Sequence, residues 1–248
     1  MGSIVTLLTD FGLADSYVAE MKAVILSKAN DVRLVDISHQ VSPGDLRAAQ
    51  YLLGRTWRRF PAGTVHLVVV DPGVGSARRA LAAHHDGHGF VGPDNGVFTQ
   101  VLDHAEIAEL PIPREASATF HGRDVFAPAA ARLVLGEPLL GLGPRLSNPI
   151  RLPAPAPRRD HGMVQGEVIY VDAFGTLIAN IPGEWVPGAA RIEVSGKPVG
   201  LLRRTFADVE SGALVGFVGS DGLLEIAVRD GSAARKLEVG VGAEVRVR

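Results

Sequence analysis

The chain has 248 residues, of which 46% are hydrophobic and 21% are charged, and it contains no cysteine. This composition is that of a globular protein with a substantial core, and the lack of cysteine excludes disulfides, zinc–thiolate sites and thiolate nucleophiles. The formal net charge of −2 gives no sign of a nucleic-acid partner or of binding to an anionic membrane. No apolar run is long enough to cross a bilayer and the N-terminus lacks a secretory-signal pattern, so we expect a cytoplasmic protein.

The first half of the chain alternates between predicted strands and helices. Continuous apolar runs at residues 4–9 and 64–70 predict buried strands, and residues 32–37 predict a further strand. Helical spacing predicts helices over residues 15–29 and from Pro43 onward, with Asp45 near the first turn. This alternation is typical of a parallel α/β sheet. We expect the sheet to continue through residues 80–84 and 90–91, and a helix to follow over residues 125–135.

The pattern changes at residues 143–157, which contain five prolines and predict a linker or a loop-rich crossover. Beyond it come six short β-rich runs separated by Gly, Pro and Asp, at residues 166–172, 177–181, 190–194, 214–218, 223–228 and 243–247. Several short strands with turn signals and few helices predict a small β-barrel or a β-sandwich.

A carboxylate directly follows the first predicted strand, in the sequence Leu-Thr-Asp-Phe-Gly at residues 8–12. Ligands of α/β proteins bind at this edge of the sheet, where Asp10 is able to accept hydrogen bonds from two vicinal hydroxyls, as in ribose. An aspartate also suits a turn or a helix N-cap, and the motif alone favours that interpretation. A protein-kinase Asp-Phe-Gly motif is excluded because only nine residues precede Asp10.

A second motif, Asp-Pro-Gly-Val-Gly-Ser-Ala-Arg-Arg at residues 71–79, follows the third predicted strand. It brings a carboxylate, a flexible turn and two guanidinium groups to the same sheet edge, and it lacks the Gly-Lys-Ser/Thr ending of a P-loop. Two interpretations stay open at this point. The motif forms either a tight turn held by an Asp–Arg pair or a site that orients a ligand or a water molecule.

Three further features have both a functional and a structural interpretation. His121, in Thr-Phe-His-Gly-Arg-Asp at residues 119–124, is able to approach a substrate, but a single loop histidine is more often a packing or surface residue. The histidines around Asp86-Gly87 offer metal ligands, but a solvated hairpin turn is the better interpretation. Phe174, on a predicted turn, either stacks on a flat base or packs on the core of its domain.

Six segments together resemble the family of S-adenosyl-L-methionine hydroxide adenosyltransferases, which are related to the fluorinases and chlorinases. They are LLTDFGLADSYVAEMKAVI, VVDPGVGSARR, VGPDNGVF, TFHGRDVFAPAAA, VDAFGTLIANI and VGSDGLLEIAVRDGSAA. The resemblance implies an N-terminal parallel-sheet α/β domain at residues 1–157 and a smaller C-terminal β-barrel domain at residues 158–248. It also implies a homotrimer that binds its ligand at the subunit interface, between one subunit's N-terminal domain and a neighbour's C-terminal domain.

By this resemblance, an Asp–Arg–His set that handles the attacking water corresponds to Asp71, Arg78 and His121, with Arg79 as the neighbouring alternative to Arg78. The remaining implied positions bind the substrate. They are Asp10 at the ribose hydroxyls, Asp15 and Asp172 near the methionine amino group, Ser220 near the methionine carboxylate, Phe174 and Phe206 around the adenine, and also Thr176, Asp221 and Val228. Thr176 replaces an Asn of many relatives, and Asp221 replaces an Arg of the fluorinases, which argues against a fluorinase-like contact there.

The implied activity is hydrolysis of S-adenosyl-L-methionine to adenosine and L-methionine, by attack of water or hydroxide on the 5′ carbon. The sulfonium makes methionine a good leaving group, so neither a metal nor a cofactor is expected. The halogenating relatives lack the Asp and the His of the set, which this chain keeps. The alternatives are a halide-dependent, chlorinase-like adenosyl transferase and a non-catalytic adenosine or S-adenosyl-L-methionine sensor. A generic α/β hydrolase ranks last because no Gly-x-Ser-x-Gly motif is present.

Overall fold

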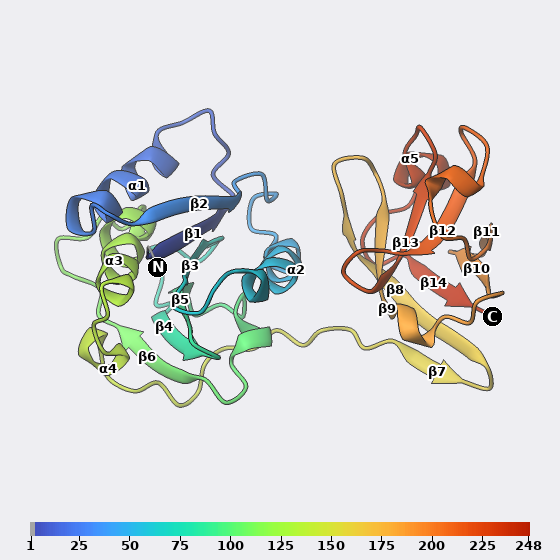
Figure 1. The fold of residues 1–248 in the computed structure, drawn as a ribbon. Coiled ribbons are helices and arrows are strands. Elements are labelled where there is room, and N and C mark those ends of the chain that lie inside the picture. Colours follow the sequence, from blue (N-terminus) through green and yellow to red (C-terminus); the bar gives the residue numbers. More distant parts are fainter. Residues whose placement is uncertain (1–2) are drawn as a thin grey trace. The chain divides into compact units, whose positions relative to one another are not determined.

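The computed structural model describes residues 3–248, and the contacts between residues divide the chain into two units, Met1–Pro153 and Ala154–Arg248. The first unit is an α/β domain and the second is rich in strands (Figure 1). The division lies within the proline-rich stretch that also contains the boundary predicted after residue 157.

The first unit is built on a six-stranded sheet with the strand order β2-β1-β3-β5-β4-β6. Neighbouring strands among β2, β1, β3 and β5 are parallel, as predicted, whereas β4 runs antiparallel to both β5 and β6. The sheet is therefore mixed at one end, because β4 and β5 form a hairpin. The strands are β1 (Ile4–Thr9), β2 (Arg33–Ser38), β3 (Val65–Val69), β4 (Ala80–His85), β5 (His88–Pro93) and β6 (Glu106–Leu110).

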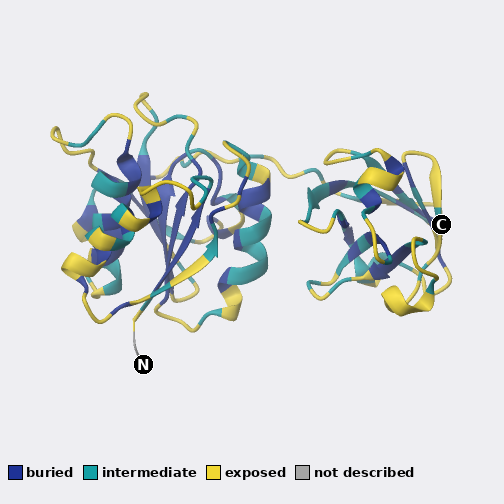
Figure 2. Ribbon diagram, turned by 90° about the horizontal axis from the view of Figure 1, so that it is seen from above, coloured by how far each residue is buried: buried dark blue, intermediate teal, exposed yellow. Residues whose placement is uncertain are grey.

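Helices cover both faces of this sheet (Figure 2), which explains why β1 and β3 are apolar along nearly their whole length and buried. Helices α1 and α3 pack against each other on one face, and α2 lies on the other (Figure 1). The helices are α1 (Tyr17–Lys28), α2 (Leu46–Thr56), α3 (Ala127–Val134) and α4 (Leu139–Leu142), with short 3₁₀ turns η1 (Trp57–Arg59) and η2 (Thr99–Val101) and a π-helical turn η3 (Gly122–Phe126).

Two predicted helix starts are corrected. Helix α2 begins at Leu46 and not at Pro43, because the side chain of Asp45 accepts a hydrogen bond from the amide of Ala48 and caps the helix. The helix predicted from residue 125 is preceded by the π-helical turn η3 and becomes α-helical at Ala127. The turn η3 begins immediately after His121, so it bears on the position of that side chain.

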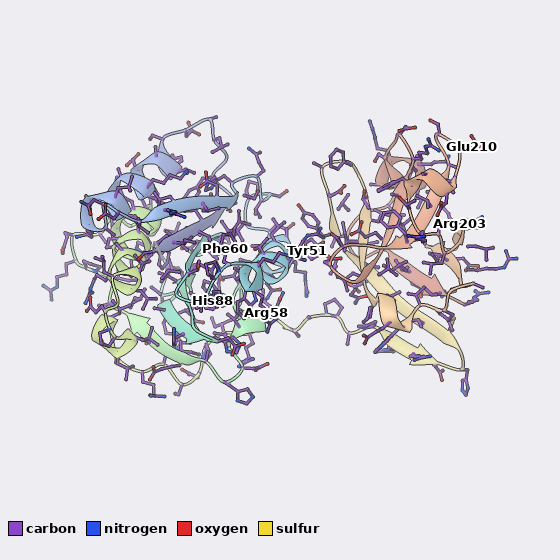
Figure 3. The ribbon with its side chains drawn as sticks, viewed as in Figure 1. Tyr51, Arg58, Phe60, His88, Arg203 and Glu210 are labelled. Atoms are coloured by element: carbon purple, nitrogen blue, oxygen red, sulfur yellow. The ribbon has the colours of Figure 1, made fainter. Side chains whose placement is uncertain are left out.

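The histidine-rich segment at residues 84–88 is the predicted hairpin turn. Asp86 and Gly87 have φ values of 49° and 77°, as the two central residues of a tight hairpin require. In the part of the chain that the structure describes, no group of three or more His, Cys, Asp or Glu side chains is placed to hold a metal ion. Beneath this hairpin lies an aromatic cluster that includes Phe60 and His88 (Figure 3), together with Trp57, His66 and Phe90.

The second unit is one eight-stranded sheet, barrel-like rather than a sandwich, in which the strands β7–β14 pair antiparallel and an isolated parallel bridge joins Leu202 to Gly216. The order is β11-β10-β14-β8-β9-β13-β12, with β7 paired to β8. The two end strands approach each other, since the amide of Arg203 donates to the carbonyl of Gly216 at 2.8 Å. The strands are β7 (Arg158–Asp160), β8 (Met163–Val171), β9 (Leu177–Pro182), β10 (Arg191–Val194), β11 (Lys197–Leu201), β12 (Leu214–Val218), β13 (Leu223–Val228) and β14 (Glu244–Val247).

Short helices complete the second unit: the 3₁₀ turns η4 (Gly183–Trp185) and η5 (Phe206–Asp208), and the helix α5 (Ala233–Leu237), whose N-cap Ser232 accepts from the amide of Arg235. No helix among residues 3–248 is long and apolar enough to cross a membrane.

Candidate active site

The first part of the site lies at the carboxyl ends of the parallel strands β1 and β3. Thr9 pairs with Val69 in the register of these strands, so the residues that follow, Asp10 and Asp71, leave the sheet at the same edge. The loop before α2 also contacts this edge of the sheet. The amide of Gly44 donates to Oδ2 of Asp10 at 2.8 Å, and a Cβ atom on Gly44 would lie 3.6 Å from Cβ of Pro72.

Arg78 contacts both of the other residues of the predicted catalytic set. Nε of Arg78 donates to Oδ1 of Asp71 at 3.1 Å and Nη2 donates to Oδ2 at 2.5 Å, which is the bidentate geometry of a strong ion pair. Nη2 of Arg78 also lies 3.0 Å from Nδ1 of His121. The Asp71 and Arg78 side chains are only 4% and 6% exposed, and His121 is buried as well. Two segments far apart in sequence, the loop after β3 and the segment that contains His121, thus converge on one buried polar cluster.

Burial sets the charge states within this cluster. It raises the pKa of Asp71, and the positive charge and hydrogen bonds of Arg78 oppose that shift. Burial also lowers the pKa of His121, and the nearby charge of Arg78 lowers it further. Because a guanidinium group only donates hydrogen bonds, Nδ1 of His121 accepts, and the neutral ring carries its proton on Nε2.

Close packing of two loops holds the cluster together. Gly75 has a φ of +77°, and a Cβ atom there would lie only 2.6 Å from the carbonyl oxygen of Ala118. The loop that carries Asp71 and Arg78 is therefore pressed against the segment that leads to His121. Arg78 is further fixed by a 3.0 Å hydrogen bond from Nη1 to the carbonyl of Arg79.

The neighbouring arginine, Arg79, binds different partners. Nε of Arg79 donates to Oδ2 of Asp94 at 2.9 Å, and Nη1 donates to Oδ1 of Asn148 at 2.9 Å. Asp94 is fully buried and also accepts from the amide of Ile150 at 2.7 Å. Arg79 thus anchors the segment that follows α4, while Arg78 faces Asp71 and His121.

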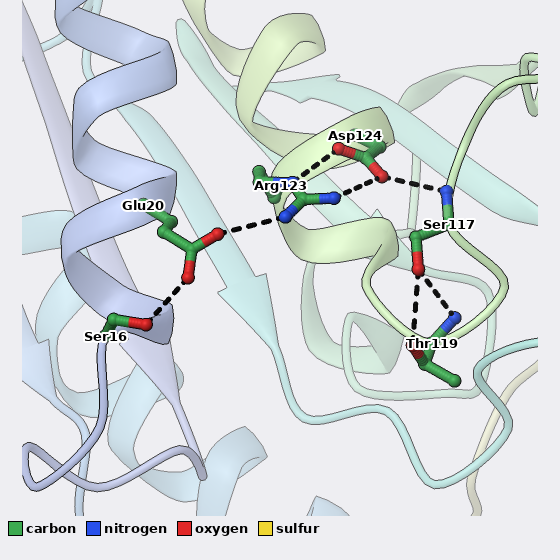
Figure 4. Close-up of polar contacts among 6 residues, drawn as sticks. All are labelled: Ser16, Glu20, Ser117, Thr119, Arg123 and Asp124. Atoms are coloured by element: carbon green, nitrogen blue, oxygen red, sulfur yellow. Dashed lines mark hydrogen bonds and ion pairs between the residues drawn. The ribbon is translucent and has the colours of Figure 1, made fainter.

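An ion-pair network fixes the loop around His121 (Figure 4). Arg123 contacts Glu20 of α1 at 3.0 Å and its neighbour Asp124 at 2.7 Å, and Asp124 accepts from the amide of Ser117 at 2.8 Å. Beside this network lies a pocket of about 330 Å³. Its walls include three aromatic rings whose centroids are 5.3–6.0 Å apart, those of Phe11, Tyr17 and Phe120.

Sequence reasoning missed these three aromatic residues as candidates. Phe11 directly follows Asp10 and Phe120 directly precedes His121, so their places in the motifs are the signal that was available. Asp15 lies nearby in chain order, in the exposed segment before α1.

The second unit has a pocket of about 920 Å³, which five of the predicted substrate-binding residues line. They are Asp172, Phe174, Thr176, Phe206 and Val228. Charged residues that were not predicted share the lining, among them Glu225, Arg229, Asp230 and Arg235.

A rigid turn presents Phe174 at this pocket. Oδ1 of Asp172 accepts hydrogen bonds from the amides of Phe174 at 2.9 Å and Thr176 at 2.8 Å. Gly175 has a φ of +82°, and any Cβ there would collide with the side chain of Ser232. Phe174 is 80% exposed, so it does not pack on the core of its own unit. Phe206 is 43% exposed, with its ring centroid 4.7 Å from that of Phe217.

Ser220 and Asp221 are not brought to this pocket within the described residues of the unit. They lie in the turn between β12 and β13, where Oδ1 of Asp221 accepts from the amide of Leu223 at 3.3 Å.

Comparisons with known proteins agree over nearly the whole chain. Residues 5–143 match the SAM hydroxide adenosyltransferase N-terminal domain, and residues 166–246 match the C-terminal domain of the same family. An (R)-S-adenosyl-L-methionine hydrolase of Thermus thermophilus is 46% identical over 97% of both chains, and a fluorinase of Nocardia brasiliensis is 31% identical over 99% of this chain and 96% of that one. A solved structure from Thermotoga maritima superposes with a TM-score of 0.92 at 39% identity, covering 98% of this chain and 99% of that one.

Proposed function

The chain belongs to the SAM hydroxide adenosyltransferase family, and from this we propose that it hydrolyses S-adenosyl-L-methionine to adenosine and L-methionine. The curated relatives with 40–46% identity carry the hydrolase name, and the fluorinases are more distant. The single observation that carries the proposal is the buried contact of Arg78 with both Asp71 and His121.

The substrate itself lowers the demands on the enzyme. Methionine leaves from a sulfonium as a neutral thioether, so the reaction needs neither a general acid nor a metal. It needs a nucleophile held in line behind the 5′ carbon, and such positioning is worth about 7–11 kcal/mol of barrier. Attack by hydroxide on a sulfonium neutralises charge, which a water-poor site favours.

The buried cluster supplies groups that are suited to activating water. In the proposal, Asp71 accepts the proton of the attacking water, because burial raises the pKa of its carboxyl and makes the carboxylate a stronger base. His121 orients that water through its Nε2 proton, since its Nδ1 is already engaged by Arg78. Arg78 stays protonated and stabilises the developing hydroxide.

We propose that the pocket of the second unit takes the adenine, supported by the exposed ring of Phe174 and the partly exposed ring of Phe206 at its wall. Thr176 and Val228 line the same pocket. By family resemblance, Asp10 holds the ribose hydroxyls, Asp15 and Asp172 the methionine amino group, and Ser220 the methionine carboxylate, with Asp221 beside Ser220.

A homotrimer in the cytoplasm, with the ligand at the subunit interface, completes the proposal and rests on the family resemblance. Light scattering coupled to size exclusion tests it, since the expected mass is three times that of the chain.

The activity is tested with purified protein and S-adenosyl-L-methionine in halide-free buffer. We expect adenosine and methionine in equal amounts, and we expect Asp71→Asn to abolish most of the turnover. Conversion that occurs only after chloride or fluoride is added, with a 5′-halogenated product, contradicts hydrolysis. Retention of ligand without any product contradicts an enzymatic role.

A further inference from the structure

A buried histidine, His39, contacts the residue that precedes Asp10. His39 follows the end of β2 and is 3% exposed. Its Nδ1 lies 2.8 Å from Oγ1 of Thr9, and its Nε2 lies 3.1 Å from Oδ1 of Asp36. The catalytic set does not use this histidine, and no predicted substrate contact involves it.

The partners of His39 set the direction of each contact. A carboxylate faces Nε2, which places the ring proton there, although Nε2 is not aligned with that oxygen as in a good hydrogen bond. With that proton on Nε2, Nδ1 is left to accept the hydroxyl proton of Thr9. Burial acts to raise the pKa of Asp36, but the hydrogen bond from Lys22 and the close ring of His39 outweigh it and hold that pKa below its usual value.

Hydrogen bonds that Thr9 and His39 accept fix the backbone on both sides of Asp10. Oγ1 of Thr9 accepts from the amide of Phe11 at 3.3 Å, and the carbonyl of His39 accepts from the amide of Gly12 at 2.7 Å. Asp10 itself is held by Gly44 through Oδ2. Among the described residues, Oδ1 of Asp10 has no hydrogen-bond partner, so one oxygen is fixed and the other is open to a ligand.

We infer that Thr9 and His39 are positioning residues that hold the Asp10 carboxylate in the orientation that receives the ribose hydroxyls. The inference rests on the proposed function, because it takes an adenosyl group as the ligand. A carboxylate that accepts from two vicinal hydroxyls must keep both its position and its tilt, and a preformed loop avoids the entropic cost of ordering it on binding.

The same sheet contains a matched control. Thr6 also lies on β1 and is also fully buried, and its Oγ1 lies 2.8 Å from Nδ1 of His66 on β3. This second Thr–His pair has the same chemistry and the same contact distance as the first. It lies three residues before Thr9, and the other nitrogen of His66 contacts His88 at 3.1 Å. Replacing Thr6 therefore removes an equivalent buried hydrogen bond without touching the Asp10 loop.

Calorimetric binding of adenosine and of 2′-deoxyadenosine to the whole protein tests the inference. Thr9→Val should raise the Kd of adenosine by about tenfold and that of 2′-deoxyadenosine by less than about threefold, because one of the hydroxyls that Asp10 receives is already missing. Thr6→Val should leave both values within about twofold of wild type. His39→Asn keeps an acceptor near the position of Nδ1 and should recover most of the affinity that His39→Ala loses.

Equal losses for the two nucleosides in Thr9→Val, or equal losses in Thr6→Val and Thr9→Val, would overturn the positioning role, because each would indicate general destabilisation. Failure of the wild-type protein to bind adenosine at all is a separate outcome. It would overturn the proposed function and this inference with it.

Discussion

At the scale of single residues, the site depends on burial. Arg78, Asp71 and His121 form a contact cluster with very little exposure to water, where each electrostatic interaction is stronger than at the surface. The family resemblance predicted these three residues as one set, whereas the motifs alone left a turn at residues 71–79 and a packing role for His121 open. The motifs did not predict the aromatic walls of Phe11, Tyr17 and Phe120, because those contacts depend on how two loops fold against each other.

Replacing Arg78 by Ala should lower kcat by about 10²–10⁴-fold and change KM by less than about fivefold, because the guanidinium stabilises charge that develops in the transition state. Steady-state kinetics with S-adenosyl-L-methionine measure both quantities. Arg132→Ala is the matched control, since it removes an exposed arginine that pairs with Glu137 on the surface. Parallel losses of kcat and of substrate affinity in Arg78→Ala would assign the residue to binding alone.

His66 makes the stability of the first unit depend on pH. The side chain is fully buried, and burial, with a smaller contribution from His88, lowers its pKa to about 3. In the unfolded chain it titrates near its ordinary value, so between these two values the unfolded state binds more protons. The contribution of His66 to the free energy of unfolding is therefore fully present above the pKa that the residue has in the unfolded chain. It is lost as the pH falls below that value.

Urea unfolding of the first unit at pH 7.5 and pH 5.5 measures this dependence. His66→Gln should remove about 1.4 kcal/mol of the difference between the two pH values, the contribution of one untitrated histidine over that interval. His161→Gln, at an exposed hairpin position, should leave the difference unchanged. A pH dependence that is the same in His66→Gln as in wild type would contradict the account.

At the scale of elements, the strands with buried faces were predicted well and the edge elements were not. Continuous apolar runs predicted β1 and β3, because strands that are covered on both faces of the sheet are apolar along their length. β11 contains Pro198 and Gly200, which weaken any strand pattern, and its pairing with β10 decides its conformation. Apolar spacing led us to expect the parallel sheet to continue through residues 80–84, but the hairpin turn predicted at Asp86-Gly87 makes β4 antiparallel to β5.

The start of α2 gives a prediction at this scale. Asp45→Ala should cost about 1 kcal/mol of unfolding free energy, because the amide of Ala48 loses its capping acceptor. Asp45→Asn should lower the free energy of unfolding by only a few tenths of that amount, because the side-chain oxygen of Asn accepts the same hydrogen bond. Denaturant unfolding compares the two variants, and equal destabilisation by Ala and Asn would show that the cap is not the cause.

At the scale of the whole molecule, the chain consists of two units, each with a pocket or cluster that suits one part of the proposed substrate. The first holds the buried cluster of Asp71, Arg78 and His121, and the second holds a pocket lined by the exposed ring of Phe174. The family resemblance covers both units, and the change from alternating helices and strands to short strands alone marked the transition between them. Ser220 and Asp221 do not line the pocket of their own unit, because the turn between β12 and β13 places them elsewhere.

Hydrolysis at the 5′ carbon is the central claim, and isotope labelling tests it most directly. The protein is incubated with S-adenosyl-L-methionine in heavy-oxygen water without halide, and the products are analysed by mass spectrometry. Hydrolysis at the 5′ carbon should give adenosine that carries the heavy oxygen at its 5′ position, together with unlabelled methionine. Adenosine without the label, or product formation that requires a halide, would contradict it.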